Sequence, residues 1–196
     1  MNRRSALAGM VLTAVTLTGS PSGLRASGGH DGASMRGPLV LDVAIDAHTL
    51  SLNNDNPADP GNPRRGSTFI VYGNVFPGGT IPSGVTSFDP DSPGSIGTWV
   101  CRGVFLADFA DIMSGAASLT VDTTQMFLLT TDRNALFTEG LEGNVGVTTH
   151  RALTGGTGHF DGVSGSVKQE TIGVNRDGGP DGLFDLRFTF MVKDEE

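Results

Sequence analysis

Apolar and polar side chains alternate along most of the chain from residue 38 onward. A period of two places successive side chains on opposite faces of a strand, so such runs predict half-buried β-strands. Clusters of Gly, Pro, Asn, Asp and Ser separate the runs, and these residues favour turns. The pattern predicts about eight strands, over Leu39–Leu50, Ser67–Phe76, Gly97–Leu106, Ser118–Thr130, Ala135–Glu139, Val145–Thr154, Val163–Val174 and Leu183–Val192.

The last of these runs has the most regular alternation. One face carries Phe184, Leu186, Phe188 and Phe190, and the other carries Asp185, Arg187 and Thr189. This run predicts a strand with one buried face. Residues 105–117, FLADFADIMSGAA, instead have helical spacing and predict a short helix or a lid.

The composition agrees with an all-β protein. Glycine supplies 29 of the 196 residues, which is about twice its usual share of roughly 7%. The net charge of −8 argues against nucleic acid as a partner, because affinity for a phosphate backbone depends on clustered Lys and Arg. The single cysteine, Cys101, excludes an intramolecular disulfide, and its apolar surroundings in the sequence predict a buried side chain.

Residues 1–26 have the features of an export signal peptide. A basic start is followed by an uncharged apolar run from Ala6 to Leu17 and by small residues that end near Ala26. The pair Arg3-Arg4 resembles a bacterial twin-arginine signal, and the general secretory route is the alternative. We therefore expect a secreted or periplasmic protein with a flexible leader over 27–37 and one domain over 38–196. No second apolar segment reaches the length of a membrane span.

The stretch RALTGGTGHFDGVSGSV, residues 151–167, allows two interpretations. A dinucleotide loop needs G-x-G-x-x-G before a helix, and a phosphate loop needs a Lys followed by Ser or Thr; neither spacing is present. Glycine also permits positive φ and close approach of backbones, which suits a sharp reversal between strands. We therefore expect a turn built by Gly155, Gly156, Gly158 and Gly162, with Phe160 as an apolar plug.

The same residues carry a resemblance to a known superfamily. TGGTGHFDGVSGSV is similar to the GGTGxFxxAxG stretch of plant dirigent proteins and of the related allene oxide cyclase barrels of bacteria and plants. The likeness is close over residues 154–167 and extends, at the level of strand order, over 38–192. It implies an eight-stranded antiparallel β-barrel with a lipocalin-like apolar cavity. It also implies a homo-oligomer, since related barrels are trimers.

The resemblance suggests several ligand-binding residues. Dirigent pockets use acidic residues near the start of the first strand, a basic residue just before the glycine motif, and nearby phenols. The corresponding residues here are Asp42 and Asp46, Arg151, and Tyr72, which is the only tyrosine. For the two aspartates, exposure to solvent on the face opposite Leu41 is the alternative.

Two further candidates come from polar residues within apolar rows. Asn74 shares a strand face with large apolar groups, and Arg102 lies in a row with Val100 and Val104. A buried arginine must reach water or pair with a carboxylate, so a pocket or a subunit interface is one interpretation of Arg102, and a side chain that extends to solvent is the alternative. His150 and His159 flank the glycines without a third ligand, so we expect no metal site and no cofactor.

These observations lead to three hypotheses about function. The first is a barrel that binds a small hydrophobic or amphipathic molecule and steers its cyclisation or isomerisation, as the resemblance implies. The second is a ligand carrier without chemistry, and the third is a structural envelope protein with a packed interior. Converging ionisable groups inside the barrel favour the first, a smooth apolar cavity the second, and a filled interior the third.

Overall fold

A computed structural model describes residues 38–54, 61–117, 120–130, 133–142, 146–175 and 184–193. The expected signal peptide and leader, residues 1–26 and 27–37, lie outside these ranges. The strands are β1 (Leu39–Asn53), β2 (Thr68–Pro77), β3 (Val85–Phe88), β4 (Gly97–Phe105), β5 (Val121–Leu129), β6 (Ala135–Glu142), β7 (Thr149–Thr157), β8 (Gly165–Asn175) and β9 (Phe184–Val192). Every predicted strand is present, and β3 is an additional one.

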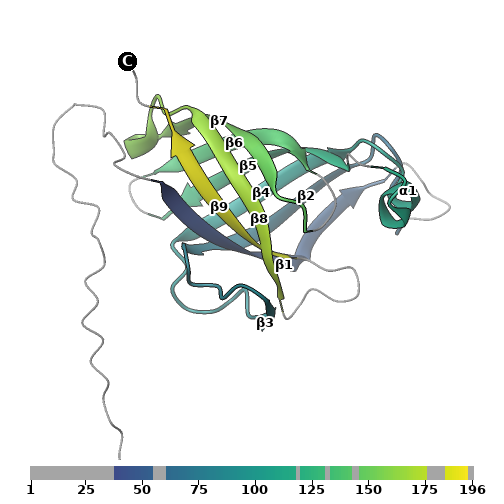
Figure 1. Ribbon diagram of the computed structural model, residues 1–196, viewed down its shortest axis with the longest axis horizontal. Coiled ribbons are helices and arrows are strands. Elements are labelled where there is room, and N and C mark those ends of the chain that lie inside the picture. The colour runs from purple at the N-terminus through teal and green to yellow at the C-terminus, as the bar shows by residue number, and fades with distance from the viewer. Residues whose placement is uncertain are drawn as a thin grey trace, which may run out of the picture. The chain divides into compact units, whose positions relative to one another are not determined.

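Eight of the strands close into an antiparallel barrel (Figure 1). The neighbours follow the order β1, β2, β4, β5, β6, β7, β8 and β9, and β9 pairs again with β1. The short strand β3 joins β8 in parallel, outside this closed ring. The predicted fold class, an all-β eight-stranded antiparallel barrel, is therefore confirmed.

Helical structure is short in the described residues. The helix α1 (Phe109–Ser114) lies within the segment predicted to be a helix or a lid, and a 3₁₀ turn spans Gly158–Phe160. No helix among the described residues is long and apolar enough to cross a membrane.

Strand alternation determines which side chains form the core. Leu186, Phe188 and Phe190 of β9 point into the barrel and are almost fully buried, as their sequence pattern predicts. The Phe127 ring lies 4.9 Å from the ring of Phe188 and 5.1 Å from that of Phe190, in edge-to-face geometry. Trp99 packs against Phe188 at 6.5 Å. These aromatic rings fill a large part of the interior, as expected for a barrel of eight strands.

The glycine-rich stretch forms the corner between β7 and β8. Gly158 has φ of 65° and starts the 3₁₀ turn, and Gly162 has φ of 76°. Gly155 and Gly156 lie at the end of β7, just after a register shift against β6. A Cβ on Gly156 would collide with the backbone oxygen of Phe160 and lie 2.9 Å from that of Ala135. The corner thus uses glycine for both positive φ and close packing.

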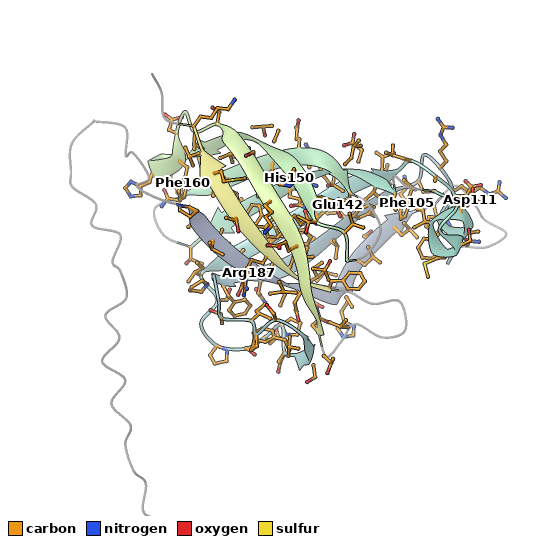
Figure 2. All side chains as sticks on the ribbon, in the orientation of Figure 1. Phe105, Asp111, Glu142, His150, Phe160 and Arg187 are labelled. Carbon is orange, nitrogen blue, oxygen red and sulfur yellow. The ribbon has the colours of Figure 1, made fainter. Side chains whose placement is uncertain are left out.

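The Phe160 side chain packs against the edge of the core. In Figure 2 it lies at one end of the barrel, whereas Phe105 and Asp111 lie toward the other. We call these the Phe160 end and the Phe105 end. Leu39, Leu129 and Val192, from strand termini at the Phe160 end, also pack against the core.

The corner generates a first prediction. We expect Gly156→Ala and Gly158→Val each to lower the free energy of unfolding by about 1–3 kcal/mol, through a backbone clash and through positive φ respectively. Urea unfolding measures the change, and Ser164→Ala, exposed in the same corner, should stay within about 0.5 kcal/mol of the original protein. A glycine variant as stable as the original, or a melting temperature raised by ATP or NAD, would contradict the turn assignment.

Candidate functional site

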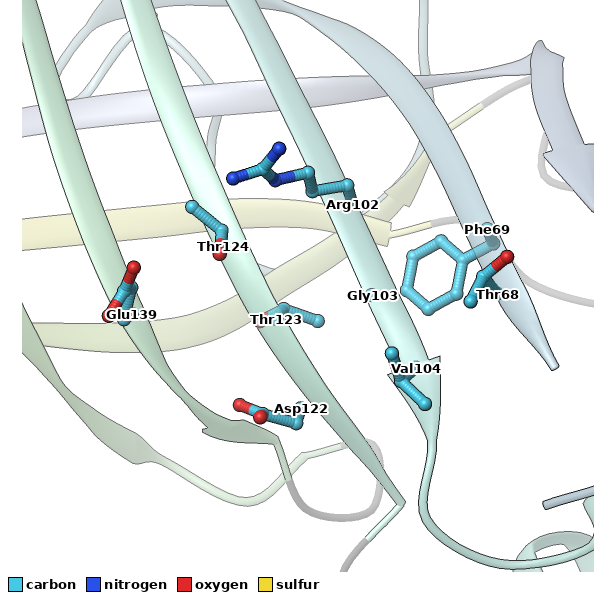
Figure 3. A pocket seen from close by; sticks show the side chains of 9 residues that line it. All are labelled: Thr68, Phe69, Arg102, Gly103, Val104, Asp122, Thr123, Thr124 and Glu139. Carbon is cyan, nitrogen blue, oxygen red and sulfur yellow. The ribbon is translucent and has the colours of Figure 1, made fainter. Parts of the chain in front are cut away.

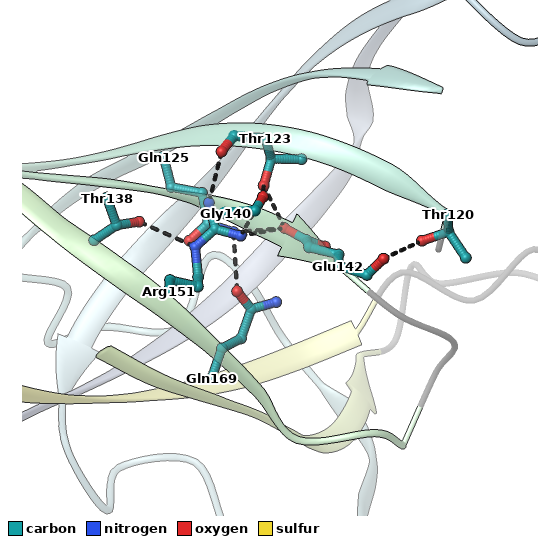
Figure 4. A network of polar contacts seen from close by, with 8 residues as sticks. All are labelled: Thr120, Thr123, Gln125, Thr138, Gly140, Glu142, Arg151 and Gln169. Carbon is teal, nitrogen blue, oxygen red and sulfur yellow. Dashed lines mark hydrogen bonds and ion pairs between the residues drawn. The ribbon is translucent and has the colours of Figure 1, made fainter. Parts of the chain in front are cut away.

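A cluster of polar side chains lies inside the barrel (Figure 4). It is nearer the Phe105 end, because Glu142 pairs with Val121 and Val121 pairs with Phe105. It arises where inward positions of β5, β6, β7 and β8 carry polar residues in place of apolar ones. The members are Thr123, Gln125, Thr138, Glu142, Arg151 and Gln169. Strand register brings them together, because Gln125 pairs with Thr138 and Thr123 pairs with Gly140.

Arg151 is the centre of this cluster, and its side chain is fully buried. Its Nε donates to Thr138 Oγ1 at 3.2 Å, and one terminal nitrogen donates to the backbone oxygen of Thr123 at 2.8 Å. The other terminal nitrogen reaches the Gly140 oxygen at 3.4 Å and Glu142 Oε1 at 3.2 Å. A Cβ on Gly140 would lie only 3.3 Å from Arg151 Cα, so glycine provides the room for this side chain.

Glu142 supplies the negative charge opposite Arg151. Its Oε1 accepts hydrogen bonds from Thr123 Oγ1 and Gln125 Nε2, each at 2.8 Å, as well as from Arg151. Its side chain keeps 23% of its surface exposed. Three donors thus hold one oxygen, and Oε2 receives no hydrogen bond from the described residues. Charge-assisted bonds of this kind are among the strongest in proteins.

Burial changes the titration of two neighbouring groups. Desolvation lowers the pKa of Arg151, although the adjacent Glu142 carboxylate counteracts this. Burial also raises the pKa of the Cys101 thiol well above its usual value, and Glu142 raises it further. Cys101 is therefore a neutral thiol that lies beside Gln125 and Thr123 of the polar cluster, and it is not poised as a nucleophile.

Some buried polar atoms of the interior have no hydrogen-bond partner. They are Gln125 Oε1, Thr149 Oγ1 and Trp99 Nε1. Thr149 pairs with Gln169 across β7 and β8 and lies two residues before Arg151, so it belongs to the same inward face. Unpartnered buried atoms are uncommon, and two of them, Gln125 Oε1 and Thr149 Oγ1, belong to the strands that carry the polar cluster around the Arg151–Glu142 pair, which marks this region as the candidate site. Outside the barrel interior, the other unpartnered buried atoms of the described residues are Asn175 Oδ1 and both carboxylate oxygens of Asp185.

A separate hollow of about 500 Å³ lies over β2, β4, β5 and β6 (Figure 3). The outward side chains that line it include Arg102, Thr124 and Glu139, which are aligned across three strands. Asp122 and Val104 form the next row. The hollow therefore combines one cation with two carboxylates on the outside of the barrel.

The structure places the sequence-predicted ligand residues in different regions. Arg151 points into the barrel, whereas Arg102 lines the outer hollow. Tyr72 is 41% exposed on the outer face. Asn74, also outward, donates to the backbone oxygen of Pro90 at 3.0 Å and so anchors a loop. Asp42 lies under the segment that follows β2, so these residues do not form a single pocket.

Asp42 is a fully buried carboxylate on the outer side of β1. Its two oxygens accept hydrogen bonds from Arg187 at 2.7 and 3.0 Å. One oxygen also accepts from the backbone nitrogens of Gly79 at 2.8 Å and Ile81 at 3.0 Å. Asp42 therefore fixes the segment that follows β2 against the barrel, and Ile81 joins Ala44, Phe76 and Ile172 in a small second core. Asp46 Oδ1 accepts a local hydrogen bond from the His48 backbone nitrogen.

A second buried carboxylate, Asp185, lies near Asp42. Neither of its oxygens forms a hydrogen bond with the described residues, and its exposed fraction is zero. Burial raises the pKa of Asp185 to about 7, the nearby Asn175 amide partly offsets this, and the charge of Asp42 adds to it. The buried carboxyl is therefore partly protonated near neutral pH. Among the described residues no three His, Cys, Asp or Glu side chains are placed to hold a metal ion.

Comparisons with known proteins do not identify a family or a function. No protein-family model matches the chain, and no curated protein is similar to it in sequence. Among solved structures, a pyocyanin demethylase is similar, with 15% sequence identity and a TM-score of 0.49 over 80% of this chain and 99% of that chain. At this level the likeness carries no argument about function, which is therefore derived from the described residues.

Sequence reasoning missed Gln125, Glu142 and Gln169. The alternation of β5 does contain the signal, because Gln125 shares the inward face with Val121 and Phe127. Gln169 likewise follows Val167 on the inward face of β8. Glu142 was missed because the predicted strand ends at Glu139, three residues before the end of β6.

Asp185 generates a second prediction, on pH dependence. Because its folded pKa lies above its unfolded value, its favourable contribution is full below about pH 4 and is lost as the pH rises to about 7. We expect Asp185→Asn to stabilise the protein by on the order of 2–4 kcal/mol at pH 8 and hardly at all at pH 4. Unfolding measured at both pH values tests this, with exposed Asp161→Asn as the control. An equal effect at both values would contradict the assignment.

Proposed function

We propose that this protein binds a small hydrophobic or amphipathic molecule inside the barrel, beside the Arg151–Glu142 pair, and steers its cyclisation or isomerisation. The single observation that carries the proposal is this ion pair, together with the unpartnered atoms Gln125 Oε1 and Thr149 Oγ1, inside the barrel. The export expected from residues 1–26 is part of the proposal, and would place the binding protein outside the cytoplasm.

Energetics support a role for the cluster beyond filling space. A buried ion pair recovers little more than the cost of removing its charges from water, and apolar residues of similar volume often stabilise a core equally well. Unpartnered polar atoms add a further cost of about 1–3 kcal/mol each. Such an arrangement is unfavourable for a purely structural interior, whereas a ligand that pairs with these atoms would offset that cost.

The chemistry available to the cluster is positioning and acid–base assistance. Val71 lies in the same layer as Cys101 and Gln125, so apolar and polar surfaces meet at this level of the barrel. A bound molecule would be oriented by both surfaces and shielded from water, which favours one ring closure or isomer over others. Glu142 Oε2 is the atom placed to accept a proton or a hydrogen bond from it.

One observation favours the alternative of a structural protein. The rings of Trp99, Phe127, Phe188 and Phe190 pack against one another and fill the interior toward the Phe160 end. An interior packed throughout in this way would bind nothing. A carrier without chemistry is the intermediate case, since it would bind ligand without any role for Glu142.

The third prediction tests binding. Trp99 is the only tryptophan of the chain and is buried inside the barrel, so its emission reports on the interior. We expect 1-octanol at up to millimolar concentration to change this emission saturably and to raise the melting temperature by mass action. Gln125→Leu should weaken binding, and Arg102→Ala, on the outer face, should leave it unchanged. Absence of any saturable change would favour the packed structural protein.

We also propose that several copies of the chain assemble through the outer face of β2, β4, β5 and β6. Strand register aligns Tyr72, Val100, Met126 and Phe137 into one apolar row across these strands, in which Tyr72 is well exposed and Val100 is buried. The adjacent row carries Arg102 and Glu139, so a second copy facing this surface offers opposite charges as well as apolar contact. The occupant is therefore a second copy of this chain.

This face generates the fourth prediction. Light scattering at micromolar concentration should give the mass of two or more chains. We expect Tyr72→Lys combined with Leu128→Lys to shift the mass to that of one chain, because both side chains are more than two-fifths exposed on this face. Met113→Lys, on the exposed side of α1, is the control and should not change the mass. A monomer for the original protein would overturn the proposal.

A further inference from the structure

The hydrogen bonds of Arg151 leave it almost no capacity to bind a ligand. The guanidinium has five N–H donors. Four of them are used by Thr138 Oγ1, the backbone oxygens of Thr123 and Gly140, and Glu142 Oε1. A carboxylate on a ligand is best bound by two parallel N–H groups of an arginine, and Arg151 has no such free pair.

Glu142, in contrast to Arg151, retains capacity to form a hydrogen bond with a ligand. Its Oε1 accepts three hydrogen bonds, whereas Oε2 receives none from the described residues. Its partly exposed side chain remains accessible to another molecule. The ion pair therefore offers a ligand the acceptor Glu142 Oε2, whereas the Arg151 guanidinium is already hydrogen-bonded to protein groups.

The neighbouring unpartnered atom Gln125 Oε1 has the same polarity, and Thr149 Oγ1 can adopt it. Gln125 Oε1 is an acceptor, and its amide orientation is fixed because Nε2 already donates to Glu142 Oε1 at 2.8 Å and to Gln169 Oε1 at 3.1 Å. Thr149 Oγ1 is a hydroxyl that can also accept. Gln169 connects the two, since it bonds to Gln125 and pairs with Thr149 across the strands. The exception is the donor Trp99 Nε1, on β4 beside the aromatic rings.

We propose that the polar end of the ligand is a hydrogen-bond donor, a hydroxyl or an amine, that is received by Glu142 Oε2 together with Gln125 Oε1 and Thr149 Oγ1. A carboxylate is rejected, because it would meet acceptors and a negative charge while Arg151 is already occupied. This inference rests on the proposed function and names the class of ligand that the same site selects.

A matched series of eight-carbon probes tests the polarity of the site. 1-Octanol donates a hydrogen bond, 2-octanone only accepts, and octanoate is an anion that only accepts. We expect Trp99 emission and melting temperature to show binding of 1-octanol at least tenfold tighter than that of octanoate or 2-octanone. A site that hydrogen-bonds a donor discriminates strongly against analogues that lack it, because its buried acceptors are then left unpaired.

Glu142→Gln provides the sharpest comparison. Arg151, Gln125 and Thr123 all donate toward the inner position, so the amide oxygen of the new side chain will occupy that position and its NH₂ group will replace Oε2. The acceptor then becomes a donor, and the preference should reverse in favour of 2-octanone and octanoate. Thr149→Val is a milder variant that removes one acceptor, and it should weaken 1-octanol binding several-fold.

The outcomes separate the two proposals. Tighter binding of 1-octanol, with reversal in Glu142→Gln, supports the inference. Octanoate or 2-octanone bound as tightly as 1-octanol by the original protein overturns the inference and leaves ligand binding intact. If none of the three probes binds while the protein is folded, the proposed function itself fails. Should Glu142→Gln not fold, the Thr149→Val result decides, and unchanged 1-octanol affinity there counts against the inference.

Discussion

The ion pair between Asp42 and Arg187 joins the first strand of the barrel to the last. Asp42 lies on β1 and Arg187 on β9, and the two residues face each other in register at the closing edge. Asp42 also accepts two backbone N–H groups from the segment after β2, while Arg187 donates to the backbone oxygen of Ile81. One buried carboxylate thus holds the seam of the barrel and the segment that covers it. The second core around Phe76 and Ile81 depends on this attachment.

Closure imposes a constraint on the interior. An eight-stranded barrel has space only for the side chains that point inward. These side chains must fill the interior and pair their polar groups with one another. Here the aromatic rings satisfy the constraint toward one end, and the hydrogen-bonded polar cluster does so toward the other. The polar part meets it incompletely, because Gln125 and Thr149 retain unpartnered atoms. In an otherwise consistent fold, a functional site is expected where buried polar groups lack hydrogen-bond partners.

Much of the fold could be predicted from the sequence, because alternation is a local property. The inward face of β9 and the outward position of Asp42 relative to Leu41 both follow from the period of two. The strand β3 was not predicted, since VTSF has only four residues between turn clusters and pairs in parallel with a distant part of β8. Its formation depends on tertiary contacts, as β-propensity often does.

The candidate site was less accessible to sequence reasoning. Arg151 was selected through a resemblance, but alternation alone does not show which strands face it across the barrel. Its contact with Glu142 requires the register of β6 against β7. The burial of Asp42 likewise depends on a loop whose path the sequence does not specify. Contacts between residues on different strands can be identified only when the pairing and register of those strands are known.

The pairing of β1 with β9 also has a kinetic consequence. Asp42 and Arg187 are separated by 145 positions, so the seam joins the two ends of the domain. Contacts between distant segments are slow to form, because the entropy of closing a long loop must be lost before the contact stabilises the chain. During synthesis β1 has β2 as a neighbour long before β9 exists, and its other edge stays open until the last strand arrives. Open strand edges can pair with other chains, so the final strand ends the period in which the nascent barrel is most prone to aggregate.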